Sequence, residues 1–324
     1  MLLAGACQDH SPQGVLDDYL ARIARVTRSE AELPLPPALP AYPARRQLVL
    51  EIPRRTIDIF EFFELHDCDL GALVGFRNSP LGRLQQASQR LGYEAAWLAA
   101  AERCGADAAE WLTEMGAGKR ERLPALFWNA TFAADEMRTA LGAAAPPPDG
   151  DLADILRGLN DTLTNLEEGD FRLAELETLL NRLRQGSWVG AARGDWSRWR
   201  RYFGVTSAML EGAGPRICLN RRPTPRAERL KNVFLKLYVQ QIQPELAVRL
   251  GRHQAWVAEI DRLSKRLQPV QPPAFAVWFD GVLSPHHPGS EWRRTRAAVV
   301  AHAEAWQALF AHCNIEPVAG LRQD

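Results

Sequence analysis

The sequence lacks any apolar run of about 18 residues, the length that a membrane-spanning helix requires. It also lacks an excess of charge of either sign, because 39 lysine and arginine residues balance 39 aspartate and glutamate residues. Dedicated nucleic-acid-binding proteins usually carry a strongly basic domain, so we expect no nucleic acid partner. No phosphate-binding loop, serine elbow or zinc-binding helix motif is present. The sequence therefore predicts no catalytic residue, no metal and no cofactor.

Cysteine is scarce, with five residues in the chain, and the first of them, Cys7, follows a short stretch of apolar and small residues. Such a stretch is typical of the end of a signal peptide. The segment Ala4-Gly5-Ala6-Cys7 resembles a bacterial lipobox, in which the cysteine is acylated and becomes the first residue of the mature protein. We interpret residues 1–7 as the remnant of a lipoprotein signal peptide, with Cys7 as the site of lipid attachment. The alternative is an ordinary thiol in a frayed terminus.

The residue after Cys7 is Gln8 rather than aspartate, which resembles the lipoproteins that are sent to the outer membrane. This resemblance implies a lipid-anchored protein of the bacterial cell envelope, on the periplasmic face of the outer membrane. An exported chain meets an oxidising environment, in which disulfide bonds form and persist.

The remaining cysteines are even in number and are Cys68, Cys104, Cys218 and Cys313. Four cysteines allow three pairings. We expect Cys68 to pair with Cys104 and Cys218 to pair with Cys313, because each bond then closes within one half of the chain. The alternative is that all four are buried and reduced.

Apolar residues recur at helical spacing along most of the chain, which predicts an all-α fold built as an antiparallel helical bundle. The clearest stripes lie at 152–166 and 173–183, separated by a glycine, and they predict a helical hairpin. Another helical pattern runs from Arg226 to Leu267, and Pro244 is expected to kink or split it.

The proline-rich segment 143–150 predicts the boundary between two helical subdomains, 8–145 and 151–324. The best strand candidate is Gln47–Ile52, which follows a second proline-rich segment. A lone strand is marginally stable, so any β structure is expected to be a minor short hairpin.

Several strings between Tyr42 and Cys104 resemble one family. They are Tyr42-Pro43-Ala44-Arg45-Arg46, Phe60-Glu61-Phe62-Phe63-Glu64-Leu65, Arg77-Asn78-Ser79-Pro80-Leu81-Gly82 and Ser88-Gln89-Arg90-Leu91-Gly92-Tyr93-Glu94. Together with the lipobox, they are similar to the domain of unknown function 3080 family of proteobacterial lipoproteins. The resemblance implies an envelope location and a single shared architecture. It brings no known activity and no functional residues.

An acidic cluster with one histidine lies in the most aromatic part of the chain, and its members are Glu61, Glu64, His66, Asp67 and Asp69. Carboxylates beside histidine can perform general acid and base catalysis or bind a metal ion. On this interpretation the protein is a hydrolase or transferase acting on cell-wall or lipid material. The alternative, which we favour, is the solvent-facing side of a helix whose phenylalanines face the core.

Two further groups of residues suggest binding of anions. Arg77, Asn78 and Ser79 stand at a predicted helix start, where free backbone amides favour an anion. A second group mixes arginine with aromatic residues and includes Arg198, Trp199, Arg221 and Arg222. For the first group the alternative is a capped helix with Arg77 paired to a nearby acid. For the second it is a buried aromatic stripe with arginines in solvent. We therefore predict a non-catalytic binding or structural component, whose partner is another envelope protein, a glycan or an anionic lipid.

Overall fold

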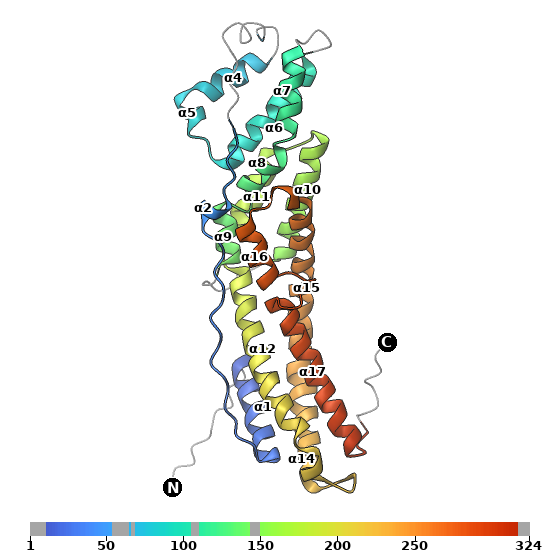
Figure 1. Cartoon of the computed structure of the whole chain (residues 1–324). Coiled ribbons are helices and arrows are strands. Elements are labelled where there is room, and N and C mark those ends of the chain that lie inside the picture. The colour runs from blue at the N-terminus through green and yellow to red at the C-terminus, as the bar shows by residue number, and fades with distance from the viewer. Residues whose placement is uncertain (1–10, 54–64, 66–68, 105–109, 143–149, 317–324) are drawn as a thin grey trace. The chain divides into compact units, whose positions relative to one another are not determined.

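The computed structural model describes residues 11–53, 65, 69–104, 110–142 and 150–316. This part of the chain is mainly helical and contains one small antiparallel ribbon of two strands (Figure 1). The predicted all-α fold is thereby confirmed. Among the described helices, none combines the length and the apolar character that crossing a membrane requires.

The chain forms two compact units, and each is assembled from segments that are distant in sequence. Unit 1 comprises Met1–Leu39, Arg193–Gln254 and His286–Asp324, and unit 2 comprises Pro40–Ala192 and Ala255–Pro285. These units differ from the predicted subdomains 8–145 and 151–324. The reason is that helices on both sides of the proline-rich segment pack together within unit 2, where the Ser187 hydroxyl also donates to the Gly142 carbonyl.

Unit 1 is a bundle of long helices, joined at one end by the two-stranded ribbon. Its elements are α1 (Pro12–Thr27), most of α12 (Trp188–Glu211), α13 (Gly214–Ile217), β1 (Cys218–Leu219), β2 (Arg222–Pro223), α14 (Pro225–Val233), the π-helix η1 (Phe234–Ile242), the first half of α15 (Gln243–Arg266) and α17 (Glu291–His312). Helix α1 is capped at its start, because the Ser11 hydroxyl accepts a hydrogen bond from the Gly14 amide at 3.0 Å.

The core of unit 1 contains a network of buried polar side chains around His302 of α17. The Tyr19 hydroxyl lies 2.7 Å from Nε2 of His302, and the Ser207 hydroxyl lies 2.9 Å from Nδ1. The Trp306 indole donates to the Tyr19 hydroxyl at 2.7 Å. The imidazole ring also stacks on Phe203, with the ring centres 4.7 Å apart. These contacts join α1, α12 and α17, which run side by side in Figure 1.

The helix predicted to be interrupted at Pro244 contains a π-helical segment just before that residue. Proline has no N–H, so the carbonyl four residues earlier loses its usual α-helical donor. The amide of Gln243 bonds to the carbonyl of Tyr238, five residues back, before the α-helix resumes. The interruption is therefore a local widening of the helix rather than a loop.

Unit 2 is built from shorter helices. They are α2 (Arg45–Leu48), α4 (Leu70–Asn78), α5 (Pro80–Arg83), α6 (Ala87–Arg103), α7 (Glu110–Arg120), α8 (Leu123–Ala130), α9 (Asp135–Leu141), α10 (Leu152–Glu168), α11 (Leu173–Leu183), the second half of α15, the 3₁₀-helix η2 (Gln268–Val270) and α16 (Pro273–Val282). The predicted hairpin is α10 and α11. Gly169 ends α10 in the left-handed region, with φ of 87°, which glycine adopts without strain.

The predicted strand Gln47–Ile52 is wrong. Its first residues belong to the short helix α2, and the following segment is extended without a strand partner. The backbone amide of Leu50 donates to the side-chain oxygen of Asn129 at 2.9 Å, and the Asn129 side-chain nitrogen donates to the Leu50 carbonyl at 2.9 Å. One asparagine of α8 thus supplies both hydrogen bonds that a neighbouring strand would supply.

Candidate functional site

Two of the predicted sites fall wholly or mostly on residues whose structure is not described. Cys7 lies outside the described residues, as do Glu61, Glu64, His66 and Asp67 of the acidic cluster. The remaining member, Asp69, is exposed and lies 3.7 Å from the guanidinium of Arg103. Cys68 is also outside the described residues, so its bond to Cys104 stays a prediction. Within the described residues, no group of three or more histidine, cysteine or acidic side chains is placed to hold a metal ion.

The predicted anion site at Arg77, Asn78 and Ser79 lies between two short helices. The Ser79 hydroxyl accepts from the Gly82 amide at 3.1 Å and so caps the four-residue helix α5. The Arg77 guanidinium donates to the Gly82 carbonyl and lies 5.8 Å from the centre of the Tyr93 ring. Ser79 therefore caps a helix as that alternative predicts, whereas the contacts of Arg77 among the described residues are to a backbone carbonyl and an aromatic ring.

The aromatic residues around Trp199 in α12 belong to the core of unit 1, whereas Arg198, Arg200 and Arg201 are only partly buried. Trp199 is 6% exposed, and the neighbouring aromatic residues Trp196, Tyr202 and Phe203 of the same helix are buried as well. Arg198 pairs with Asp195 at 3.1 Å, and Arg249 of α15 pairs with the other oxygen of the same carboxylate at 2.7 Å. A pocket of about 20 Å³ beside this cluster has space for about one water molecule. The Asp195–Arg249 pair therefore joins α12 to α15, whereas Arg198 pairs within its own helix.

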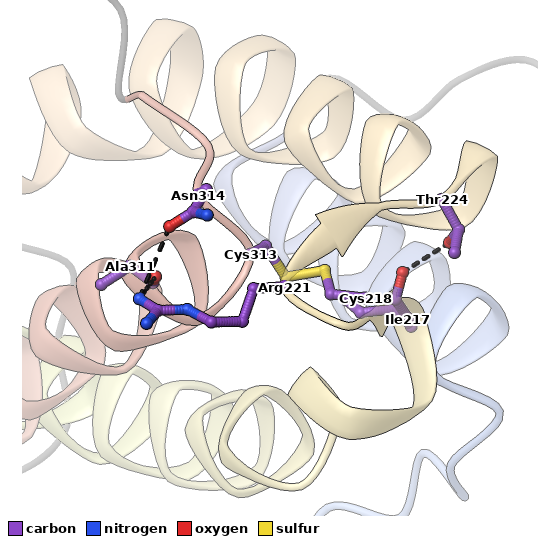
Figure 2. Close-up of a disulfide and its surroundings, with 7 residues drawn as sticks. All are labelled: Ile217, Cys218, Arg221, Thr224, Ala311, Cys313 and Asn314. Atoms are coloured by element: carbon purple, nitrogen blue, oxygen red, sulfur yellow. Dashed lines mark hydrogen bonds between the residues drawn. A yellow bond between two sulfur atoms is a disulfide. The ribbon is translucent and has the colours of Figure 1, made fainter.

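Arg221 and Arg222 occupy a different setting, at the hairpin formed by β1 and β2. Figure 2 shows that Cys218 of β1 is bonded to Cys313, just after α17, and their Cα atoms are 5.4 Å apart. This bond is the second pair of the predicted connectivity. Both cysteines are buried, with exposed fractions of 3% and 0%.

The hairpin turn is formed by Asn220 and Arg221, whose φ angles of 52° and 61° are both positive. Two consecutive residues of this kind are typical of the tight turn that matches strand twist. The Arg221 side chain reaches back to the end of α17, where it donates to the Ala311 carbonyl at 3.4 Å and to the Asn314 side chain at 3.5 Å (Figure 2). Arg222 is exposed and has no ion pair within the described part of the chain.

Unit 2 contains a polar pocket of about 430 Å³ that the sequence did not indicate. It is lined by Arg45, Gln86, Ala87, Ser88, Asn129, Ala130, Ala134, Asp135, Glu136, Thr139, Glu177, Leu180 and Arg184. Ser88 is 4% exposed, and its hydroxyl donates to the Glu177 carboxylate at 2.6 Å. Arg184 pairs with Glu136. The size and the mixed charges suit a small polar molecule held by hydrogen bonds.

These pocket residues were missed because no local pattern connects them. Ser88 and Glu177 are 89 positions apart, and only the packing of α6 against α11 brings them together. Ser88 does belong to one of the strings that carry the family resemblance, which is the single signal in the sequence.

Comparison with known proteins gives one match. No curated protein and no solved structure matches the chain. The model of the family described as "Protein of unknown function (DUF3080)" matches residues 16–317, which confirms the resemblance seen in the sequence and shows that this chain belongs to that family.

Proposed function

We propose that this chain is an exported, lipid-anchored protein of the bacterial envelope, which binds another envelope component and catalyses no reaction. The observation that carries the proposal is the buried disulfide between Cys218 and Cys313. Disulfides persist in oxidising compartments such as the periplasm and are rare in the reducing cytosol. This supports export independently of the lipobox.

The anchor itself rests on Cys7, which follows small residues in the pattern of a lipobox. Acylation of this cysteine would fix the protein to a membrane without a spanning helix. Gln8 favours the outer membrane, with the two units in the periplasm. A binding role is supported by the exposed arginines at the hairpin, which have no carboxylate partner within the described residues.

The test is metabolic labelling of cells with radioactive palmitate, using the natural full-length precursor and a Cys7→Ser variant. Label in the wild-type protein and none in the variant is the expected result. A Cys313→Ser variant is the matched control, because it removes a different cysteine and should keep the label. Wild-type protein that takes up no palmitate would refute the anchor.

Membrane fractionation and thiol trapping complete the test. The wild-type protein should sediment with the outer membrane, and the thiols of Cys218 and Cys313 should resist alkylation until a reductant is added. Free thiols at both positions in freshly lysed cells would contradict export, whatever the labelling shows.

A further inference from the structure

The end of unit 1 that carries the hairpin is unusually rich in arginine. The segments that meet there are 25–31, 211–231 and 311–316, and they contain seven arginines and one lysine against four glutamates. The whole chain, in contrast, has zero net charge. Positive charge is therefore concentrated at one place in an otherwise balanced protein.

Tertiary contacts bring these segments together. The Arg226 guanidinium of α14 donates to the Val26 carbonyl in the last turn of α1 at 2.6 Å. The disulfide attaches the hairpin to the residue that follows α17. Figure 1 shows the hairpin at the same end as α14 and the last turn of α1. One surface thus collects arginines from two distant parts of the sequence, 25–31 and 211–231.

Arg28, Arg216, Arg222 and Arg229 are exposed on this surface. None of them forms an ion pair with a carboxylate within the described part of the chain. The same positive charges act on the nearby Arg226. Partial burial and the charges of Arg28, Arg229 and Arg216 together lower its pKa. Four like charges held together, none of them in an ion pair within the described residues, make a favourable site for a surface of negative charge.

An apolar side chain projects from the same surface. Leu219 of β1 is 65% exposed, and it is separated from Arg222 only by the two-residue turn. A leucine beside several arginines suits the boundary between lipid head groups and acyl chains, where the cations meet phosphates and the leucine leaves water. A hydrated anionic polymer would give the leucine no apolar environment.

We propose that this arginine-rich end, formed by Arg28, Arg216, Arg222, Arg229 and Leu219, docks on a membrane surface through the phosphates of anionic phospholipids. The inference rests on the proposed envelope location, because that location supplies the membrane. It does not depend on acylation of Cys7.

The lipid anchor constrains how the contact is made. Cys7 precedes α1 by five residues, a span of at most about 17 Å. Helix α1 has 16 residues and a length of about 24 Å, and the arginine-rich surface lies at its far end. In the anchored protein, this surface therefore meets the anchoring membrane with α1 inclined rather than upright.

The experiment uses the purified full-length chain with Cys7→Ser, so that no acyl group contributes, and measures sedimentation with phospholipid vesicles. Vesicles of phosphatidylcholine alone are compared with vesicles that also contain phosphatidylglycerol. We expect binding to the anionic vesicles, weakening as salt is raised, and little binding to the neutral ones. Equal binding to both compositions, or none to either, would overturn the proposal.

The variant Arg216→Gln/Arg222→Gln/Arg229→Gln tests the surface. Each arginine near an anionic membrane contributes about fivefold in affinity, so the triple variant should bind on the order of 100-fold more weakly. The matched control, Arg46→Gln/Arg83→Gln/Arg252→Gln, removes three other exposed arginines that have no ion pair among the described residues. If the control lost binding to the same degree, only the net charge of the protein would matter. That result would refute the proposal that the membrane binds at the arginine-rich end.

The variant Leu219→Ser distinguishes a phospholipid membrane from other polyanionic ligands. Insertion of the leucine among lipids predicts about tenfold weaker vesicle binding for this variant. An unchanged affinity, together with equally tight binding of polyglutamate, would overturn the assignment to phospholipid. Circular dichroism and an intact Cys218–Cys313 bond establish that each variant is folded. Vesicle binding alongside a failure of palmitate labelling would refute the anchor alone and leave this inference standing.

Discussion

Arg193 of α12 and Glu291 of α17 form a buried, bidentate ion pair across 98 positions of the sequence. The arginine Nε donates to one carboxylate oxygen at 2.9 Å, and Nη2 donates to the other at 2.7 Å. The exposed fractions of the two residues are 0% and 2%. The pair stands at the first turn of α17 and so fixes where this helix begins against α12.

Removing the charge of one partner should destabilise the protein strongly. Glu291→Gln would leave the Arg193 charge buried without a counter-charge, which costs about 3–5 kcal/mol in the free energy of unfolding. Urea denaturation of the variant and of the wild-type protein measures this loss in the free energy of unfolding. Asp170→Asn is the matched control, because its pair with Arg172 is mostly exposed and contributes about 1 kcal/mol or less. Similar losses in the two variants would contradict the role of burial.

Acidification should destabilise unit 1 through two histidines. Burial lowers the pKa of His302 to about 3 and that of His253 to about 4, whereas an unfolded histidine has a pKa of about 6.5. Below about pH 6.5 the unfolded chain therefore binds protons that the native protein does not. The stability that these residues confer is complete above pH 6.5 and is lost progressively as the pH falls towards 4 and 3.

The expected slope is about 1.4 kcal/mol per pH unit for each histidine between pH 6 and pH 5. Urea unfolding at several pH values in this range measures it. The variant His253→Asn should lose the contribution of one histidine to this slope. A stability that is constant over this range in the wild-type protein would show that these rings are not held neutral.

Reduction of the Cys218–Cys313 bond should destabilise unit 1. The bond links residues separated by 95 positions, and loop-closure entropy predicts a loss of roughly 4–5 kcal/mol when it is opened. Thermal unfolding with and without reductant measures the change. The Cys218→Ser/Cys313→Ser variant should resemble the reduced wild-type protein, and reductant should change that variant much less. If the Cys218→Ser/Cys313→Ser variant proved as stable as the oxidised wild-type protein, a stabilising role for the bond would be excluded.

Asn129 should prove important for the extended segment that crosses unit 2. Asn129→Asp keeps the acceptor for the Leu50 amide but loses the donor for the Leu50 carbonyl. An unsatisfied, partly buried carbonyl costs about 1–3 kcal/mol, which urea denaturation would detect. Thr139→Ala serves as the control, because it removes only an exposed hydrogen bond within one helix. Equal stability of Asn129→Asp and the wild type would indicate that water replaces the lost donor.

The local features of this fold were predictable from sequence because their causes lie within a few residues. The cap at Ser79, the α10–α11 hairpin and the interruption at Pro244 all depend on neighbours in the chain. The interpretation of the aromatic residues around Trp199 as a buried stripe was also correct for Trp199, because helical spacing identifies the buried face.

The assignment of Gln47–Ile52 as a strand failed because its hydrogen-bond partner is a side chain 79 positions away rather than a strand. The predicted subdomain boundary differs from the two units for a related reason. Proline content describes the local backbone, whereas a compact unit is defined by which distant segments pack together.

The sequence by itself determined the helical class, the helix starts, the family and the expectation of export, because each follows from short-range patterns. The tertiary structure alone decided that Arg193 is a core residue, that Ser88 and Glu177 line one pocket, and that the arginines around the hairpin share one surface. These outcomes depend on contacts between residues that lie tens to hundreds of positions apart, and no short-range pattern records them.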